Sequence, residues 1–222
     1  MASILMGTAA LLLIWRFVGA PVVDEGGRPA VPTEAISIAG TPTFGDVGAA
    51  VVMIGYSDFR CPFCARFASQ VLPVLREEYV DTGRLRFAFK HLPLSIHPFA
   101  GPAARVAECA ARQGRFWAVH DALFTLSGQP FDLAAVTSTV QSVGVDSVAL
   151  TGCLADDASE AVQRDQAEAA RLGIASTPYF LIGHRQDDGR VRIVTVVKGA
   201  APVSEFRRAI ERVRDEAQGT TR

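Results

Sequence analysis

A pair of cysteines, Cys61 and Cys64, restricts the fold of this chain more than any other feature, because of where it stands. The apolar run at 49–56 precedes it and is typical of a strand buried on both faces. A helical pattern over 62–79 follows it and opens with a proline, which favours the first turn of a helix. The pair therefore lies where a buried strand meets the start of a helix, and Pro73 should kink that helix.

The segments downstream of the pair extend this unit into an α/β fold. The alternating run at 84–90 predicts a second strand, which completes a parallel βαβ unit. Two further strands are predicted at 178–184 and 190–198, with a turn between them, and an amphipathic helix over 202–217 follows. The block between the two halves predicts only helices. Four helical patterns fill it, at 100–114, 115–127, 132–144 and 156–173.

The composition supports one folded domain and gives no sign of a nucleic-acid partner. Of the 222 residues, 49% are hydrophobic, which is enough for a substantial core. The formal net charge is -1, so the chain lacks the basic excess that nucleic-acid binding requires. The four cysteines are an even number, which fits an oxidising compartment where disulfides persist.

The N-terminal part of the chain predicts a segment that precedes the folded domain. Residues 1–23 are mostly apolar and fit either a signal peptide or a membrane anchor. In an anchor, Arg16 would lie within the bilayer at a cost of about 2.5–3.5 kcal/mol at mid-depth. An apolar helix packed on the domain is the third alternative. Residues 24–47 are rich in glycine and proline and predict a linker, with one short strand near 35–40.

The position of Cys61 favours redox chemistry. The first N–H groups of a helix have no partner within the helix, and with the helix dipole they stabilise an anion such as a thiolate. This environment lowers a cysteine pKa from its ordinary value near 8.5. Arg60 is expected to add positive charge beside the sulfur. Cys64 falls one turn later, where its thiol can close a disulfide with Cys61 and act as the resolving thiol.

Two other interpretations of the pair are weaker. A zinc site normally takes four ligands, and neither the remaining cysteines nor the four histidines show the spacing of such ligands. A purely structural disulfide between neighbouring turns would close a very short loop and add little stability. We therefore predict a redox-active pair, with no metal and no cofactor.

Five segments of the chain resemble the DsbA-like thiol:disulfide oxidoreductases, which have a thioredoxin fold with an inserted helical domain. The resemblance covers 48–215 and places the helical insertion at about 96–172. A Cys-Pro-x-Cys motif becomes quite specific for this family when Thr-Pro-Tyr-Phe follows it more than a hundred residues later. The matching segments are SDFRCPFC at 57–64, LPVLREEY at 72–79, KHLPL at 90–94, RFWAVHDALF at 115–124 and LGIASTPYFLIG at 172–183.

This resemblance implies the residues of the site. Cys61 and Cys64 would be catalytic, with Cys61 forming a mixed disulfide with the substrate. The peptide bond before Pro178 would be cis, in a loop that offers backbone groups to an extended substrate segment. Judged without the resemblance, this proline could equally start an ordinary strand. The predicted substrate contacts are Thr177, Pro178, Pro62 and Phe63.

The resemblance also suggests supporting roles. Asp58 would lie beneath the pair and assist proton transfer, although a turn or capping role suits it equally well. Phe63, Phe99 and Tyr179 are expected to form an apolar rim around the reactive sulfur.

Cys109 is expected in one helix of the predicted insertion and Cys153 near the end of another, 44 residues further along the chain. We expect them to bond to each other, as in some DsbA-like proteins with a second disulfide in the helical insertion. Closing a loop of that length would stabilise the domain by roughly 4 kcal/mol at most. The alternative is two separate buried thiols.

The predicted function is that of an exported, periplasmic or otherwise extracytoplasmic thiol:disulfide oxidoreductase, acting as an oxidase rather than an isomerase or reductase. Its substrates would be cysteine-containing exported proteins, and a membrane redox partner would reoxidise it. The residues between the two cysteines resemble both oxidases and isomerases, so the direction rests on the low pKa expected for Cys61. The alternative is a non-catalytic binding module or chaperone on the same fold, with structural disulfides.

Overall fold

The computed structural model describes residues 30–129, 131–156 and 159–219. The predicted signal peptide or anchor at 1–23 lies outside the described residues, as does the first part of the predicted linker. Across the ranges that are described, no helix combines the length and apolar character needed to cross a membrane.

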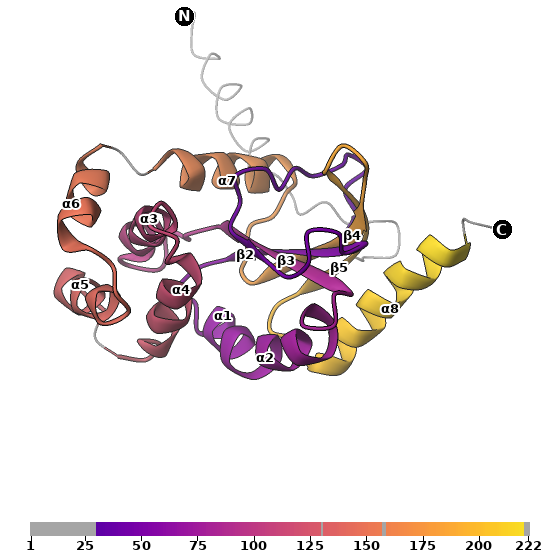
Figure 1. The fold of residues 1–222 in the computed structure, drawn as a ribbon, viewed down its shortest axis with the longest axis horizontal. Coiled ribbons are helices and arrows are strands. Elements are labelled where there is room, and N and C mark those ends of the chain that lie inside the picture. The colour runs from indigo at the N-terminus through magenta and orange to yellow at the C-terminus, as the bar shows by residue number, and fades with distance from the viewer. Residues whose placement is uncertain (1–29, 130, 157–158, 220–222) are drawn as a thin grey trace, which may run out of the picture.

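A five-stranded mixed sheet forms the centre of the molecule, in the order β1-β3-β2-β4-β5 (Figure 1). β2 is parallel to β3 and antiparallel to β4, so the predicted βαβ and ββα halves meet along β2. The predicted α/β fold with a helical insertion is confirmed, and the four main strands lie within one or two residues of their expected positions. The strands are β1 (Thr43–Phe44), β2 (Val51–Ser57), β3 (Leu85–His91), β4 (Tyr179–Arg185) and β5 (Val191–Lys198).

The expected short strand near 35–40 is wrong in position. That segment makes a single bridge, between Ile36 and Val191, while the short strand β1 forms later and pairs antiparallel with β3. The difference follows from packing. The ring of Phe44 in β1 lies 4.5 Å from Trp117 and 5.4 Å from Phe87, which ties this part of the chain to the sheet edge.

The predicted helix over 62–79 forms as a continuous helical run with two wider turns. It comprises α1 (Pro62–Arg66), a π-helical segment η2 (Phe67–Val71), α2 (Leu72–Leu75) and a second π-helical segment η3 (Arg76–Val80). The N–H of Leu72 donates to the carbonyl of Phe67, five residues back. This wide turn directly precedes Pro73, whose ring would otherwise press on the carbonyl four residues back.

Two apolar cores lie on opposite faces of the sheet. The larger core joins the helical run at 62–80, called the active-site helix below, the insertion and α8 to one face, while α7 covers the other (Figure 1). Alternation along β2 divides its side chains, with Met53 facing the larger core and Ile54 facing the smaller one. The remaining helices are α3 (Ala100–Ala111), α4 (Phe116–Thr125), α5 (Leu133–Ser142), α6 (Ser147–Ala155), α7 (Glu160–Arg171) and α8 (Val203–Gly219).

Cys153 lies near the end of a helix, as expected, but the helical pattern of that helix, α6, was not recognised. Its sequence, SVALTGCLA, is apolar on all sides and carries a glycine, so it lacks the polar and apolar stripes that identify the other helices. The side chain of Asp146 accepts a hydrogen bond from the N–H of Ala149 and caps its first turn.

Candidate active site

Cys61 occupies the boundary between the turn after β2 and the start of α1. It is the N-cap residue of α1, with extended backbone, and its side chain is buried at 3% exposure. Its N–H donates to the carbonyl of Asp58 at 3.1 Å, and its own carbonyl accepts from Ala65 at 3.1 Å. Pro62 stands at the first position of the helix, where it forfeits no helical hydrogen bond.

The loop before β4 lies directly against this cysteine. The Sγ atom of Cys61 is 3.5 Å from the carbonyl oxygen of Thr177, which comes from a segment 116 residues away in the sequence. The peptide bond between Thr177 and Pro178 is cis. The structure therefore brings together the two cysteines, Thr177 and Pro178, as the sequence analysis expected of one site.

The surroundings of Cys61 favour its thiolate. A hydrogen bond from Cys64 is the largest cause, and the Thr177 side chain and the N–H groups of Cys64 and Phe63 add to it. Burial opposes them, but the net result lowers the pKa of Cys61 to about 5. The helix start acts here through specific N–H groups, as the sequence predicts.

Arg60 takes no part in this effect, contrary to expectation. Its guanidinium lies over the ring of Phe131, 4.5 Å from the ring centroid, and it is not among the groups that shift the pKa of Cys61. Stacking on an aromatic face is a favourable site for this cation, and here it draws the charge toward the insertion.

Cys64 has the opposite character. Burial raises its pKa well above the ordinary value, and the neighbouring Cys61 sulfur raises it further. The Ser57 side chain opposes the increase. The two cysteines are free in the structure, and at neutral pH these shifts favour a thiolate at Cys61 and a thiol at Cys64.

Asp58 is fully engaged in holding the turn before Cys61. One carboxylate oxygen accepts from the N–H of Arg60 at 2.7 Å, while the other accepts from the N–H of Leu94 at 2.9 Å and from Nδ1 of His97 at 2.7 Å. These bonds favour the turn-forming role over proton transfer, which stays a prediction. His97 lies 39 residues from Asp58 in the sequence, so no local pattern signalled this contact.

Two of the three residues expected to form an apolar rim around Cys61 are exposed on the surface. Phe63 and Phe99 are about half exposed, and Ile96, on the loop that Asp58 anchors, is exposed as well. Tyr179 is 7% exposed and belongs to the smaller core, so its assignment to the rim is wrong. As the first residue of β4, it turns its side chain to the α7 face of the sheet.

Cys109 and Cys153 form a disulfide between α3 and α6. Their sulfurs are 2.07 Å apart and their Cα atoms 5.8 Å apart, so the bond closes a loop of 44 residues within the insertion.

A buried polar cluster on the α7 face was not anticipated from the sequence. Glu168 of α7 pairs with Lys90 of β3 and accepts a hydrogen bond from the hydroxyl of Tyr56 in β2. Nearby, Asp165 accepts from the N–H of His91 at 2.9 Å. These contacts fasten α7 to the ends of β2 and β3, next to the turn that carries Cys61.

Comparison with known proteins supports the same fold. The sequence model of the family described as "Thioredoxin" matches residues 37–211. The structure is similar to alpha-DsbA1 of Wolbachia pipientis, with a TM-score of 0.73 and 23% identity over 84% of this chain and 97% of that one. It is also similar to a thioredoxin-like oxidoreductase from Silicibacter pomeroyi DSS-3, with a TM-score of 0.65 and 26% identity over 79% of this chain and 92% of that one. For oxidised BdbD from Bacillus subtilis the TM-score is 0.64, with 21% identity over 82% of this chain and 97% of that one.

The curated relatives are much longer proteins. The Na(+)/H(+) antiporter NhaA 3 of Salinispora tropica is 34% identical over 172 residues, which are 76% of this chain. The chain spans about a quarter of the length of the curated relatives it matches. With a family match over most of the folded part and this architecture, the chain belongs to the thioredoxin family and has the fold of the DsbA-type oxidoreductases.

Proposed function

We propose that the protein is an exported thiol:disulfide oxidoreductase that introduces disulfides into cysteine-containing exported proteins through Cys61. The observation that carries the proposal is the contrast between the two sulfurs. The pKa of Cys61 is lowered to about 5 while that of Cys64 is raised, and the Cys61 sulfur faces the carbonyl before Pro178. A structural disulfide has no need of such a difference.

The proposed reaction begins with the pair oxidised. A substrate thiolate attacks the Cys61 sulfur, the bond between Cys61 and Cys64 breaks, and Cys64 leaves as a thiolate that takes up a proton. A second substrate thiolate then attacks the substrate sulfur of the mixed disulfide and expels Cys61 as a thiolate. The substrate loses two electrons and the enzyme gains them. A membrane redox partner that accepts the two electrons would complete the cycle.

The direction of the proposal follows from the leaving group. A thiol of low pKa leaves readily and remains ionised at neutral pH, which stabilises the reduced form and makes the disulfide a stronger oxidant. We expect the potential of the pair to lie above the value of about −270 mV that is typical of thioredoxin. Equilibration with glutathione buffers measures it, and a potential near −270 mV would contradict the oxidase direction.

The catalytic role is tested with two matched substitutions in the same motif. The assay follows the oxidation of a peptide with two cysteines, and mixed disulfides are detected by mass under non-reducing conditions. Cys64→Ser cannot form the enzyme disulfide, so it should lose peptide oxidation. When it is given the disulfide form of the peptide, its Cys61 thiolate should break the peptide disulfide, and the resulting mixed disulfide should accumulate because the Cys64 thiol that would release it is gone. Cys61→Ser should form none and lose peptide oxidation. Full activity of Cys61→Ser, or equal trapping by both variants, would exclude the proposal and favour a non-catalytic binding module.

Export is a separate part of the proposal and rests on the apolar segment at 1–23. A fusion of the full chain to a reporter enzyme that is active only outside the cytoplasm tests it. We expect reporter activity with the natural sequence, and its loss when two leucines of the segment, Leu11 and Leu12, are replaced by arginine. Equal reporter activity in the two fusions would contradict export through this segment.

A further inference from the structure

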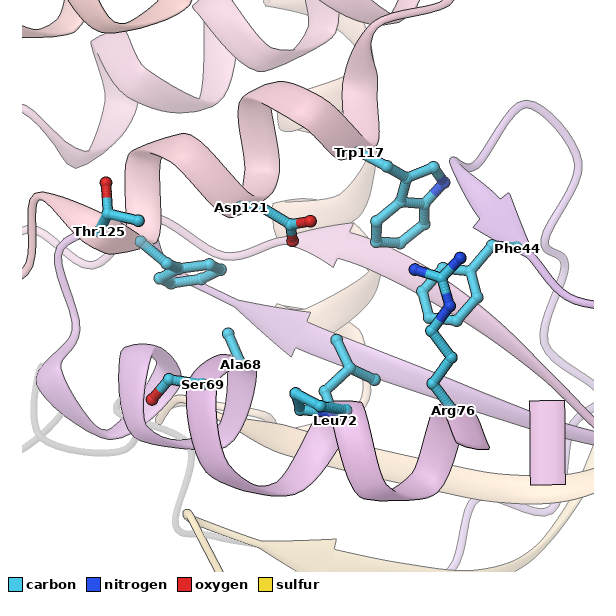
Figure 2. A pocket seen from close by; sticks show the side chains of 10 residues that line it. Phe44, Ala68, Ser69, Leu72, Arg76, Trp117, Asp121 and Thr125 are labelled. Carbon is cyan, nitrogen blue, oxygen red and sulfur yellow. The ribbon is translucent and has the colours of Figure 1, made fainter. Parts of the chain in front are cut away.

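A pocket of about 390 Å³ lies between the active-site helix and the insertion, and neither cysteine of the pair lines it. Figure 2 shows it framed by α4 on one side and the η2 and α2 segments on the other, with Phe44 of β1 at one end. Its volume falls within the range of small-molecule sites, about 300–1,000 Å³. The lining residues are Phe44, Ala68, Ser69, Leu72, Pro73, Arg76, Trp117, Asp121, Phe124 and Thr125.

The neutral polar groups of this pocket are already used by the protein itself. The hydroxyl of Ser69 donates to the carbonyl of Ala65 at 2.8 Å, and that of Thr125 donates to the carbonyl of Ala122 at 2.6 Å. The indole N–H of Trp117 donates to the carbonyl of Thr43 at 3.1 Å. These walls therefore offer a ligand apolar and aromatic surface, and few neutral hydrogen-bond donors.

Asp121 supplies the charge that remains available. Its side chain is 73% exposed and points into the space between α4 and the active-site helix (Figure 2). One carboxylate oxygen accepts from Nδ1 of His120 at 2.8 Å. Burial lowers the pKa of His120, so this partner is neutral at neutral pH and leaves the carboxylate charge uncompensated.

Arg76, the cation of the pocket, is already engaged by two groups of the protein. Arg76 lies over the ring of Phe44, 5.4 Å from its centroid, and its Nε atom is 3.6 Å from a carboxylate oxygen of Asp81. Its charge is thus partly balanced at the far end of the pocket. Asp121 lies on α4 with Trp117, away from that end, and carries the charge that this part of the pocket presents.

We propose that this pocket binds a small organic cation, an apolar body that carries one ammonium group. The ammonium would pair with Asp121, and the aromatic rings of Trp117 and Phe124 would receive the body and the adjoining charge. A carboxylate and an aromatic face both favour a cation, and neither favours an anion. The site is independent of the proposed thiol chemistry, since none of its lining residues belongs to the cysteine pair or the loop before β4.

Three probes of matched shape test the charge preference on the full chain. 3-Phenylpropylamine, 3-phenylpropan-1-ol and 3-phenylpropionate differ chiefly in the terminal group. Binding is measured by calorimetry and mapped by amide chemical shifts. We expect the amine to bind roughly tenfold more tightly than the alcohol, from an exposed ion pair together with a cation–π contact, and the carboxylate to bind weakest. Shifts should cluster at residues 68–76 and 117–125.

Two variants and one control separate the effect of the charge from that of the cavity. Asp121→Asn keeps an acceptor for His120 but removes the charge, so the amine should lose its advantage while the alcohol binds as before. Asp187→Asn, in the exposed hairpin before β5, removes an equal charge far away and should change nothing. Ser69→Trp should fill the pocket and abolish binding of all three probes.

Several results would overturn this proposal. They are equal affinity of amine and alcohol, a preference that survives in Asp121→Asn, and no detectable binding of the amine. If Ser69→Trp fails to fold, the shift map of the natural protein decides whether the probe sits here, and shifts confined to other elements would exclude this pocket.

Discussion

Cys64 contributes more than any other group to stabilising the thiolate of Cys61, and a matched pair of substitutions tests this contribution. Cys64→Ala removes the donor that contributes most to lowering the pKa of Cys61, whereas Cys64→Ser keeps a donor at the same place. A hydrogen bond to a charged group is worth about 1.5–3 kcal/mol, and about 1.4 kcal/mol corresponds to one pH unit. The titration midpoint of Cys61 should therefore rise by roughly one to two pH units in Cys64→Ala and move much less in Cys64→Ser.

The ultraviolet absorbance of the thiolate near 240 nm measures this titration directly, with Cys61 the only free thiol in either variant. The natural protein should show a first midpoint near pH 5, from the lowered pKa of Cys61. Identical midpoints in the two variants would refute the assigned role of the Cys64 donor. A midpoint near 8.5 in the natural protein, the value of a free cysteine, would refute the reasoning about the site as a whole.

Three other predictions concern stability. The lowered pKa of Cys61 stabilises the folded reduced form most fully above pH 9 and progressively less as pH falls toward 5. Between pH 7 and pH 5 the reduced protein should therefore lose about 2 kcal/mol of unfolding free energy relative to the oxidised protein. Urea unfolding of both forms measures this difference, and an unchanged difference would contradict the prediction. Replacing both Cys109 and Cys153 by alanine should cost up to about 4 kcal/mol in urea unfolding, and no loss would show that the loop closure contributes nothing. Phe206→Ala, in the core under α8, should cost about 3–5 kcal/mol, against less than about 0.5 kcal/mol for the exposed Arg208→Ala on the same helix, and comparable losses would contradict the burial assigned to Phe206.

Much of the fold could be predicted because its strands and longer helices have recognisable local patterns of apolar residues. The apolar run of β2, the alternation of β3 and the stripe of α8 each reflect a single face or pair of faces that must be buried. The junction that carries Cys61 follows from the same local patterns. Helix α6 failed this test because its apolar residues surround it, and its position is set by packing within the insertion.

The parts of the site that escaped prediction depend on contacts between distant segments. Asp58 meets His97 and Leu94 only because the loop after β3 folds back beside the turn after β2. Arg60 turns to Phe131, which lies 71 residues ahead of it. The burial of Tyr179 follows from which face of β4 meets α7, a matter of strand register that one sequence does not reveal.

The wide turn η2 has a consequence for how the active-site helix tolerates change in length. A π-helical turn contains one more residue than an α-helical turn. The helical segments before and after η2 are therefore rotated relative to each other as they would be in a regular α-helix one residue shorter. Shortening the chain at Gln70, which is exposed, would return the segment to regular winding and leave Cys64 and Leu75 in phase. Pro73 is the obstacle, since regular winding would bring its ring against the backbone, and a shortened helix therefore requires a different residue there.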